Sequence, residues 1–470
     1  MHDSKFSTNS TDLVGEGSRL FGGRRRRSQR SRGFDGPLRV GVLIDLEASP
    51  SAGGHVKCWQ RLAEAAARRD VGIDLTVHFQ GPVRKEIPLA AHVRYALSPP
   101  VFSTARLPFI PSTPADTDLA PFHPALARWL LRYDVVHTTD AYFNYASTAR
   151  LMTRILRRPL TTSLHTDTPS YTRKYSEKAI RGLLGDGALA DFLCDTLAMP
   201  ERLGRRMDAR LRRYMARCDA VLVSERHGQT RPDGLRPDAP VGILRRAVDR
   251  NLFHPRRRDR ARLQSAFGIP AERFVLLFAG RLDHGKSVMT LAHAARALLD
   301  CGADIQAVFA GDGPEIETIG ALLGDRATLP GNLPQDSLAW LYASADLFAF
   351  PSQVEISPNV VLEAMASGLP VLVAQSGGGV YVERNGQDGF VLFDADPDLW
   401  SNTIEALIAA PDRLQAVGAR AREAAVTRHP TWNDVLLQDL IPTWREAFRR
   451  KLEQRSQHVR QTDRPSHPAS

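Results

Sequence analysis

Short apolar runs alternate with segments of helical periodicity along most of this 470-residue chain, and this alternation limits the possible folds more than any other feature. The runs Arg39–Ile44, Ala220–Ser224 and Phe274–Ala279 have the length of buried strands. Segments such as His55–Arg69 and Val288–Leu299 repeat apolar side chains at helical spacing. Strands that alternate with helices pair in parallel, so the pattern predicts doubly wound α/β domains. Their ligands bind beyond the carboxyl ends of the strands.

Two stretches interrupt the alternation. Pro82–Pro124 is rich in proline, and His227–Pro240 is rich in glycine, proline and charge; we interpret the second as a linker. A chain of 470 residues is also too long for one hydrophobic core. We therefore predict an N-terminal Rossmann-like domain over residues 38–232 and a C-terminal one over residues 233–428, with a cleft between them. Outside the domains we expect a disordered basic tail over residues 1–37 and a polar tail over residues 451–470.

The composition is that of a soluble globular protein with a basic excess. Hydrophobic residues make up 43% and charged residues 24% of the chain, and no apolar run is long enough to span a bilayer. The polar start lacks the apolar region of a secretory signal, which predicts a cytoplasmic protein. The formal net charge of +10 favours an anionic partner, either phosphate groups or an acidic lipid surface. No interleaving of aromatic and basic side chains follows the run Arg24–Arg27, so we do not expect a nucleic-acid partner.

Two basic segments leave a choice between a membrane role and a structural one. The basic tail is either a solvated segment or a tether to an anionic membrane surface. The amphipathic helix Met199–Arg217 leads directly into a strand run, which favours packing on a sheet over lying on a membrane. A peripheral position at the inner face of the membrane is therefore a hypothesis.

The cysteines indicate neither a disulfide framework nor a metal site. Cys58, Cys194, Cys218 and Cys301 are scattered, without a CxxC pair. They predict reduced core thiols and no structural zinc.

The densest chemical signal is the segment Pro351–Pro370, PSQVEISPNVVLEAMASGLP. It follows an apolar strand run, so it begins at the carboxyl end of a strand. Ser357 suits a helix N-cap and Pro358 the first helical position. The helix would then direct the free N–H groups around Asn359 and Val360 toward the cleft, where a helix N-terminus binds phosphate.

Two glutamates flank this helix start. Glu355 in the loop and Glu363 farther along the helix are placed to accept hydrogen bonds from sugar hydroxyls on either side of a diphosphate. An exposed pair on a short helix is the alternative, but the neighbours of Glu363 are apolar and carboxylates are rarely buried without a partner. The segment resembles the Glu-x7-Glu signature of glycosyltransferase family 4, a retaining family with the GT-B fold of two facing Rossmann-like domains. The resemblance implies that Glu355 contacts the donor hexose and Glu363 the nucleotide ribose.

A second loop, Gly280–Ser287, lies between a strand run and a helix and carries Arg281 and Lys286. The family resemblance implies that these two cations neutralise the donor diphosphate, which activates it as a leaving group. The same segment also fits the P-loop pattern G-x-x-x-x-G-K-S, so a P-loop nucleoside triphosphatase is an alternative. Its candidate magnesium ligand, Asp312, precedes Gly-Pro, which indicates a turn into a helix instead.

The N-terminal half matches the family in shorter segments. Gly53 and Gly54 resemble the first glycine-rich loop, which lies against the donor phosphate and the acceptor, although such a pair is also common in plain turns. The segment Ser163–Asp167 resembles the loop whose histidine, here His165, faces the donor sugar in lipid-glycosylating members. A core histidine with satisfied hydrogen bonds is the equal alternative for His165. We interpret His137 as structural.

Near the end, Pro430–Trp432 and the amphipathic stretch after it resemble the final family helix, which crosses back to the first domain; we place it at residues 429–450. Other positions depart from the family pattern. Ile356–Asn359 replaces a glycine-rich variant, Ser287 stands where glycine is usual, and Arg245–Asp249 replaces Asn-Gly-Val-Asp. None of these changes removes a charged donor contact, but they leave the donor sugar and base open.

The resemblance implies a retaining transfer that needs no metal and no bound cofactor. The leaving diphosphate helps to deprotonate the acceptor hydroxyl, and the protein supplies orientation and charge. Asp394 and Asp396 look like a metal-binding DxD motif, but Pro397 and a helical pattern follow, which favours helix capping. The expected partners are a UDP- or GDP-hexose donor and a lipid or glycan acceptor. A catalytically silent sugar-nucleotide-binding protein is a third interpretation.

Overall fold

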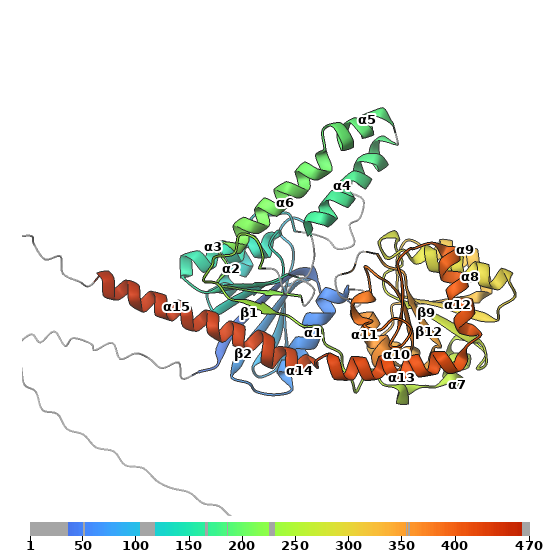
Figure 1. The fold of residues 1–470 in the computed structure, drawn as a ribbon. Coiled ribbons are helices and arrows are strands. Elements are labelled where there is room, and N and C mark those ends of the chain that lie inside the picture. The colour runs from blue at the N-terminus through green and yellow to red at the C-terminus, as the bar shows by residue number, and fades with distance from the viewer. Residues whose placement is uncertain are drawn as a thin grey trace, which may run out of the picture. The chain divides into compact units, whose positions relative to one another are not determined.

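The computed structural model describes residues 36–49, 52–103, 118–164, 168–185, 187–224, 231–353, 355 and 358–462. The basic segment before residue 36 and the last eight residues therefore lie outside the described part. The described residues after Gly36 contain two sheets, each with its own helices (Figure 1).

The first sheet has eight strands in the order β3-β4-β2-β1-β5-β6-β7-β8. All neighbours pair in parallel except β3 and β4, which are antiparallel. The winding reverses at β1, so β1 and β5 flank the switch point of this sheet. The strands are β1 (Leu38–Glu47), β2 (Ile73–Gln80), β3 (Lys85–Ala90), β4 (Val93–Ser98), β5 (Val135–Thr138), β6 (Leu160–Ser163), β7 (Ala220–Val223) and β8 (Val241–Ile243).

The proline-rich stretch after residue 82, which we had not assigned to strands, contains β3 and β4. Pro88 lies on β3, an edge strand, and is aligned with Arg94 of β4. An edge strand tolerates proline because one side of its ladder has no partner. The prolines therefore interrupt the alternation without ending the sheet.

The helices of the first lobe cover its sheet, except for the group α4, α5 and α6. Helix α1 buries the apolar face that the periodicity predicts, including Trp59 and Leu62. In contrast, α4, α5 and α6 project away from the sheet (Figure 1). These helices are α1 (Gly54–Ala67), α2 (Pro124–Leu130), α3 (Asn144–Leu156), α4 (Thr168–Leu184), α5 (Ala188–Asp191), a π-helix (Phe192–Thr196) and α6 (Met199–Met215).

The expected packing of α6 on the sheet is correct only for its carboxyl end. Tyr214 and Met215 are buried in the core of the first lobe, whereas the rest of α6 pairs with α4. Arg173 of α4 forms an ion pair with Asp208 of α6 at 2.8 Å. Most of α6 therefore lies against α4 and not on the sheet.

The second sheet has six strands in the order β11-β10-β9-β12-β13-β14, all parallel. This is the doubly wound order, with its switch point between β9 and β12. The strands are β9 (Phe274–Ala279), β10 (Ile305–Ala310), β11 (Ala327–Gly331), β12 (Leu347–Phe350), β13 (Val371–Ala374) and β14 (Phe390–Leu392). The α-helices are α7 (Arg260–Phe267), α8 (Val288–Asp300), α9 (Ile316–Leu323), α10 (Gln335–Ser344), α11 (Asn359–Ala366), α12 (Pro397–Ile408) and α13 (Pro411–Arg428). Short 3₁₀ helices among the described residues are Pro255–Arg257, His284–Lys286, Gly324–Arg326 and Gly379–Tyr381.

The first lobe extends beyond the expected boundary at residue 232. Strand β8 pairs with β7, and Leu244 and Ala247 pack into the core of the first lobe. The stretch interpreted as a linker therefore connects two strands of one sheet. Its proline and glycine content fits a loop inside a lobe as well as a linker between lobes.

After α13 the chain returns to the first sheet. It forms α14 (Trp432–Val435), a π-helix (Leu436–Leu440) and α15 (Ile441–Thr462), so the last helix continues past residue 450. Trp444 of α15 is fully buried in the first core and donates its indole N–H to His137.

Three of the four cysteines are buried as predicted, but Cys301 is exposed because it directly follows the last turn of α8. In the part of the chain that the structure describes, no helix is both long and apolar enough to cross a membrane. The same residues contain no group of three or more side chains suited to hold a metal ion.

Candidate functional site

The loops that follow β9 and β12 meet at the switch point of the second sheet. They carry the two charged segments that the sequence singled out, and an ion pair between Lys286 and Glu355 joins them. Both side chains are mostly buried, with 25% and 19% exposed. The fold therefore brings together two residues that are 69 positions apart.

Glycines hold the loops after β9 and β10 against each other. Gly280 and Gly311 have φ of 148° and 153°, which only glycine adopts readily. A Cβ atom on Gly311 would overlap the carbonyl oxygen of Gly280. The backbone N–H of Leu282 donates to the backbone carbonyl of Asp312 at 2.9 Å, which joins the two loops, and shortly after Asp312 the chain turns into α9, as its sequence context indicates.

Asp283 organises the cationic loop, a role that the sequence analysis missed. Its carboxylate accepts hydrogen bonds from Arg281 Nε at 2.9 Å and from the backbone N–H of Lys286 at 3.1 Å. It thus caps the short 3₁₀ turn His284–Lys286 and fixes the guanidinium of Arg281. An aspartate three positions before Lys286 is the sequence signal that could have indicated this cap.

Lys286 keeps its charge near neutral pH. Burial lowers the pKa of its amine to about 8, while Asp283 acts in the opposite direction and Arg281 adds to the lowering. The adjacent Glu355 carboxylate also favours the charged form. A partly desolvated ammonium of this kind is well suited to a diphosphate.

Helix α11 begins one residue later than predicted. Pro358 occupies the N-cap, with φ −74° and ψ 118°, and Asn359 is the first helical residue, whereas Ser357 lies outside the described residues. The fixed φ of proline fits the N-cap as well as the first turn, so the two positions are hard to distinguish from sequence. The free N–H groups of Asn359 and Val360 still lie at the start of the helix.

Two buried polar atoms beside this helix start have no hydrogen-bond partner among the described residues. They are the Oγ of Ser352, directly after β12, and the Oδ1 of Asn359. Such atoms are costly unless a ligand or water bonds to them. Their position indicates a polar ligand at the start of α11.

Glu363 lies one helical repeat farther along, in a mostly apolar setting. Its carboxylate is 3.5 Å from the hydroxyl of the buried Tyr342, a long hydrogen bond. Burial raises the pKa of Glu363 to about 7, opposed by Arg61 and by hydrogen bonds from Tyr342 and Gln335. A ligand hydroxyl would add a further hydrogen bond to this carboxylate and favour its charged form.

The backbone of the loop after β9 does not form a phosphate cradle. A P-loop needs free N–H groups that converge on the phosphates. Here the N–H groups of Leu282, Lys286 and Ser287 donate to Asp312, Asp283 and His284 within the protein. The P-loop interpretation is therefore not favoured.

The glycine-rich turn after β13 packs against the loop after β12, which belongs to the candidate site. A Cβ atom on Gly377 would lie 2.0 Å from the carbonyl oxygen of Ser352. The glycine thus allows this turn to pack against the loop after β12, a close approach within the protein.

In the first lobe, Gly53 caps α1 and Gly54 is its first residue. A Cβ atom on either glycine would have no neighbour within 4 Å, so this helix start is accessible to a ligand. His165 lies outside the described residues. His137 is structural, as predicted: it is fully buried, and Thr161, Ser163 and Trp444 bond to its ring.

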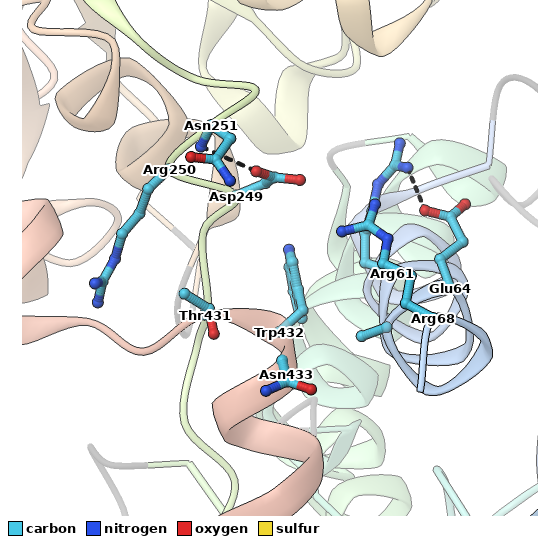
Figure 2. A pocket seen from close by; sticks show the side chains of 10 residues that line it. Arg61, Glu64, Arg68, Asp249, Arg250, Asn251, Thr431, Trp432 and Asn433 are labelled. Carbon is cyan, nitrogen blue, oxygen red and sulfur yellow. Dashed lines mark hydrogen bonds and ion pairs between the residues drawn. The ribbon is translucent and has the colours of Figure 1, made fainter. Parts of the chain in front are cut away.

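Farther along α1, a pocket of about 400 Å³ lies between this helix, the loop after β8 and the start of α14. Figure 2 shows Arg61 and Glu64 of α1 joined by an ion pair, which spans 2.6 Å, with Asp249 and Trp432 on the facing elements. Arg61 also lowers the pKa of Glu363, which connects α1 electrostatically to the glutamate of the second lobe. No motif in the sequence singled out Arg61, which lies in the middle of α1.

Asp396, the second aspartate of the DxD-like segment, lies at the start of α12. Its carboxylate accepts from the backbone N–H of Asp398 and caps α12, which confirms the capping interpretation.

Known proteins match both lobes. A family model described as "Glycosyl transferases group 1" matches residues 259–424, and one described as "Glycosyltransferase Family 4" matches residues 52–230. A D-inositol 3-phosphate glycosyltransferase of Catenulispora acidiphila is 34% identical over 39% of this chain and 47% of its own length. A GDP-mannose-dependent alpha-mannosyltransferase of Corynebacterium glutamicum is 35% identical over 31% of this chain and 34% of its own. The matches thus span less than half the length of these relatives.

Solved structures agree on the fold. Sucrose-phosphate synthase from Thermosynechococcus elongatus superposes with a TM-score of 0.62 at 18% identity, covering 88% of this chain and 100% of that one. Anabaena HepE in complex with UDP and glucose gives 0.58 at 20% identity, covering 85% and 98%. With two parallel doubly wound sheets and a family model matched on each lobe, the chain belongs to glycosyltransferase family 4 and has the GT-B fold.

Proposed function

We propose that this protein is a retaining, metal-independent hexosyltransferase, which moves a hexose from a UDP- or GDP-sugar to a lipid or glycan acceptor. The observation that carries the proposal is the pairing of Lys286 with Glu355 at the switch point of the second sheet. Similar proteins support a nucleotide-sugar donor: one relative is a GDP-mannose-dependent alpha-mannosyltransferase, and HepE, which shares the fold, was solved with UDP-glucose.

Donor binding would use the charges and the unpartnered atoms of the site together. Arg281 and Lys286 would neutralise the diphosphate, assisted by the N–H groups at the start of α11. The diphosphate would compete with Glu355 for Lys286, and the carboxylate of Glu355 would then accept hydrogen bonds from the hexose hydroxyls. Glu363 would accept them from the ribose.

The chemical step needs no protein nucleophile. The bond between the anomeric carbon and the leaving phosphate oxygen breaks, and the acceptor oxygen bonds to the same face of the sugar. The acceptor proton passes to the leaving phosphate, which gives a glycoside and a nucleoside diphosphate. Arg281 and Lys286 would stabilise the charge that develops on the leaving group. His165 stays a predicted contact of the donor sugar, and Gly53 and Gly54 predicted contacts of the donor phosphate and the acceptor.

A peripheral position on an anionic membrane, at its cytoplasmic face, is part of the proposal. It is supported by the far end of the projecting helices, where Leu183, Leu189 and Phe192 have 85%, 58% and 48% of their surface exposed. Six arginines lie along α6. Exposed apolar side chains next to cations are typical of surfaces that bind anionic lipid.

Vesicle sedimentation tests the membrane part. Wild type should bind vesicles that contain phosphatidylglycerol and lose most binding in high salt, whereas Leu183→Ser/Phe192→Ser should bind more weakly. Leu151→Ser/Ile155→Ser is a matched control, because both residues are exposed apolar residues on α3. Binding that does not depend on lipid charge or on salt would refute membrane attachment through anionic lipid.

Thermal unfolding tests the donor assignment. UDP-, GDP- and ADP-sugars are added in EDTA, beside ATP with magnesium, to wild type, Glu363→Ala and the control Glu317→Ala on the exposed face of α9. One nucleotide sugar should raise the unfolding temperature of wild type and of the control but not of Glu363→Ala, because only a bound ligand stabilises the native state. Stabilisation by ATP with magnesium alone, equal in all three proteins, would favour the nucleoside triphosphatase. Donor binding without release of nucleoside diphosphate in the presence of acceptor lipids and glycans would favour a silent binding protein.

A further inference from the structure

A second pocket, of about 520 Å³, lies at the opposite edge of the first sheet. It is lined by Leu160, the first residue of β6, and by Asp219, the residue before β7, and hence lies at the amino ends of these strands. Helix α15 completes it, packed against β5 and β6 (Figure 1). The ligands of doubly wound sheets bind at the carboxyl ends, so this pocket is separate from the candidate donor site.

Eight of the 13 residues that line the pocket are cations. One carboxylate, that of Asp219, faces seven arginines and one lysine. The cations are Arg150, Arg154, Arg157, Arg158, Arg217, Arg236, Lys451 and Arg455.

The inner cations are held in place by the protein. The buried Asp219 pairs with Arg236 at 3.1 Å and with Lys451 at 3.2 Å, and it also accepts from the backbone N–H of Leu160 at 3.0 Å. Arg455 donates to the carbonyl oxygen of Leu156 at 2.6 Å. This inner layer is therefore fixed before any ligand arrives.

The outer cations are exposed, and within the described ranges no carboxylate lies within ion-pair distance of them. They are Arg150, Arg154, Arg157 and Arg217. Arg157 has φ 52°, a conformation that residues with a Cβ atom rarely adopt. Arg154, Arg157 and Arg217 stand at the carboxyl ends of α3 and α6, from different parts of the sequence.

A purely structural role does not account for so many cations. Arginines near helix carboxyl ends interact favourably with the helix dipole, but two helix ends need far fewer. The crowding has a cost: burial lowers the pKa of Arg455, and the neighbouring Arg158 and Arg157 lower it further. Like charges at short range repel, and an anion would relieve that repulsion.

We infer that this pocket binds a multiply charged phosphate-type anion, either a soluble polyphosphate group or the headgroup of an anionic lipid. Arginine forks pair with phosphate oxygens in a bidentate manner, which fits an arginine-rich pocket better than a lysine-rich one. The volume lies within the range of about 300–1,000 Å³ usual for small-ligand sites.

Titration calorimetry with inorganic tripolyphosphate at low salt tests the inference on the full chain. Four proteins are compared: wild type, the pocket variant Arg154→Gln/Arg157→Gln/Arg217→Gln, the control variant Arg69→Gln/Arg84→Gln/Arg256→Gln, and Lys286→Ala. The control removes three exposed arginines outside the pocket, so both triple variants lose the same net charge. Lys286→Ala separates binding at the candidate donor site from binding at the pocket.

The pocket variant should bind tripolyphosphate at least about tenfold more weakly than the control variant, and Lys286→Ala should keep the pocket component. Sedimentation with phosphatidic acid vesicles identifies the source of the anion. If the pocket variant selectively loses vesicle binding, the ligand is a lipid headgroup. If it selectively loses tripolyphosphate binding and keeps vesicle binding, the ligand is a soluble anion. Arg154→Lys/Arg157→Lys/Arg217→Lys, which keeps the charge, should fall between wild type and the pocket variant. Equal losses in the pocket and control variants, for both probes, would overturn the inference, because binding would then follow net charge alone.

Discussion

At the ligand-facing edge of the first sheet, two carboxylates bond to neighbouring groups of the protein, whereas at the same edge of the second sheet two buried polar atoms have no partner among the described residues. In the first lobe, Asp45 accepts from Gln80 and from the backbone N–H of Tyr145, and Asp140 accepts from the first residues of the next turn. In the second lobe, the atoms Ser352 Oγ and Asn359 Oδ1 have no partner among the described residues. Both sheets share the same winding. A saturated network stabilises a scaffold, and an unsaturated one is suited to a ligand.

The largest effect should come from removing a charged side chain at the ligand-facing edge of the second sheet. Lys286→Ala should lower kcat/KM about 100- to 1,000-fold, because charge on the leaving diphosphate would lose its nearest cation. Lys286→Arg should retain part of the activity, and Lys85→Ala, which removes an exposed lysine from β3, should match wild type. Nucleoside diphosphate release measures all three. Full activity of Lys286→Ala would place the diphosphate elsewhere.

A side chain of the first lobe whose hydrogen bonds are already formed within the protein should affect stability instead. Burial lowers the pKa of His137 to about 3, so the ring is neutral, and Trp444 donates to its Nδ1 at 3.3 Å. His137→Ala should reduce the free energy of unfolding by about 2–4 kcal/mol, since it leaves buried partners unsatisfied. Urea unfolding measures the loss. The thermal shift on donor addition should persist; its disappearance with unchanged stability would make His137 a ligand contact.

Glu363 should make stability depend on pH in a direction opposite to that of a paired carboxylate. Burial raises its pKa from 4.5 to about 7, so the folded state binds the proton more tightly than the unfolded chain does. The associated stability is fully present below pH 4.5 and is lost as pH rises through about 7; the total loss is about 3 kcal/mol. In urea unfolding from pH 5 to pH 8, Glu363→Gln should show a smaller decline than wild type. Parallel curves would mean that Glu363 titrates normally.

The smallest effect should come from Asp283, which supports the site without an expected donor contact. Asp283→Asn weakens the cap of the 3₁₀ turn and the hold on Arg281, so unfolding should become easier by about 1 kcal/mol. We expect KM for the donor to rise more than kcat falls, because Arg281 would lose its orientation. Steady-state kinetics over donor concentration separates the two. An unchanged KM would mean that Arg281 is positioned by other contacts.

The contrast between the edges also explains what the sequence could predict. The alternation of strands and helices indicated both sheets, because buried strands and amphipathic helices differ in period. Lys286, Glu355 and Glu363 were found because each follows a predicted strand or sits on the helix that follows one. The local sequence also indicated the cap at Asp396.

What the sequence could not predict depends on contacts between distant segments. The pairing of Lys286 with Glu355 needs β9 and β12 to be neighbours. Strand β8 is three residues long, too short for a periodic signal, so the boundary of the first lobe was misplaced. The basic pocket gathers arginines from α3, α6 and α15, and no single stretch of sequence reveals it.

Proton NMR of the sugar formed from the stabilising nucleotide sugar, in EDTA, tests the central claim most directly. If the site transfers a hexose with retention and without metal, the product anomer first observed will have the same configuration as the donor, and Lys286→Ala will form it far more slowly. Product of inverted configuration, or no product until magnesium is added, would contradict the account.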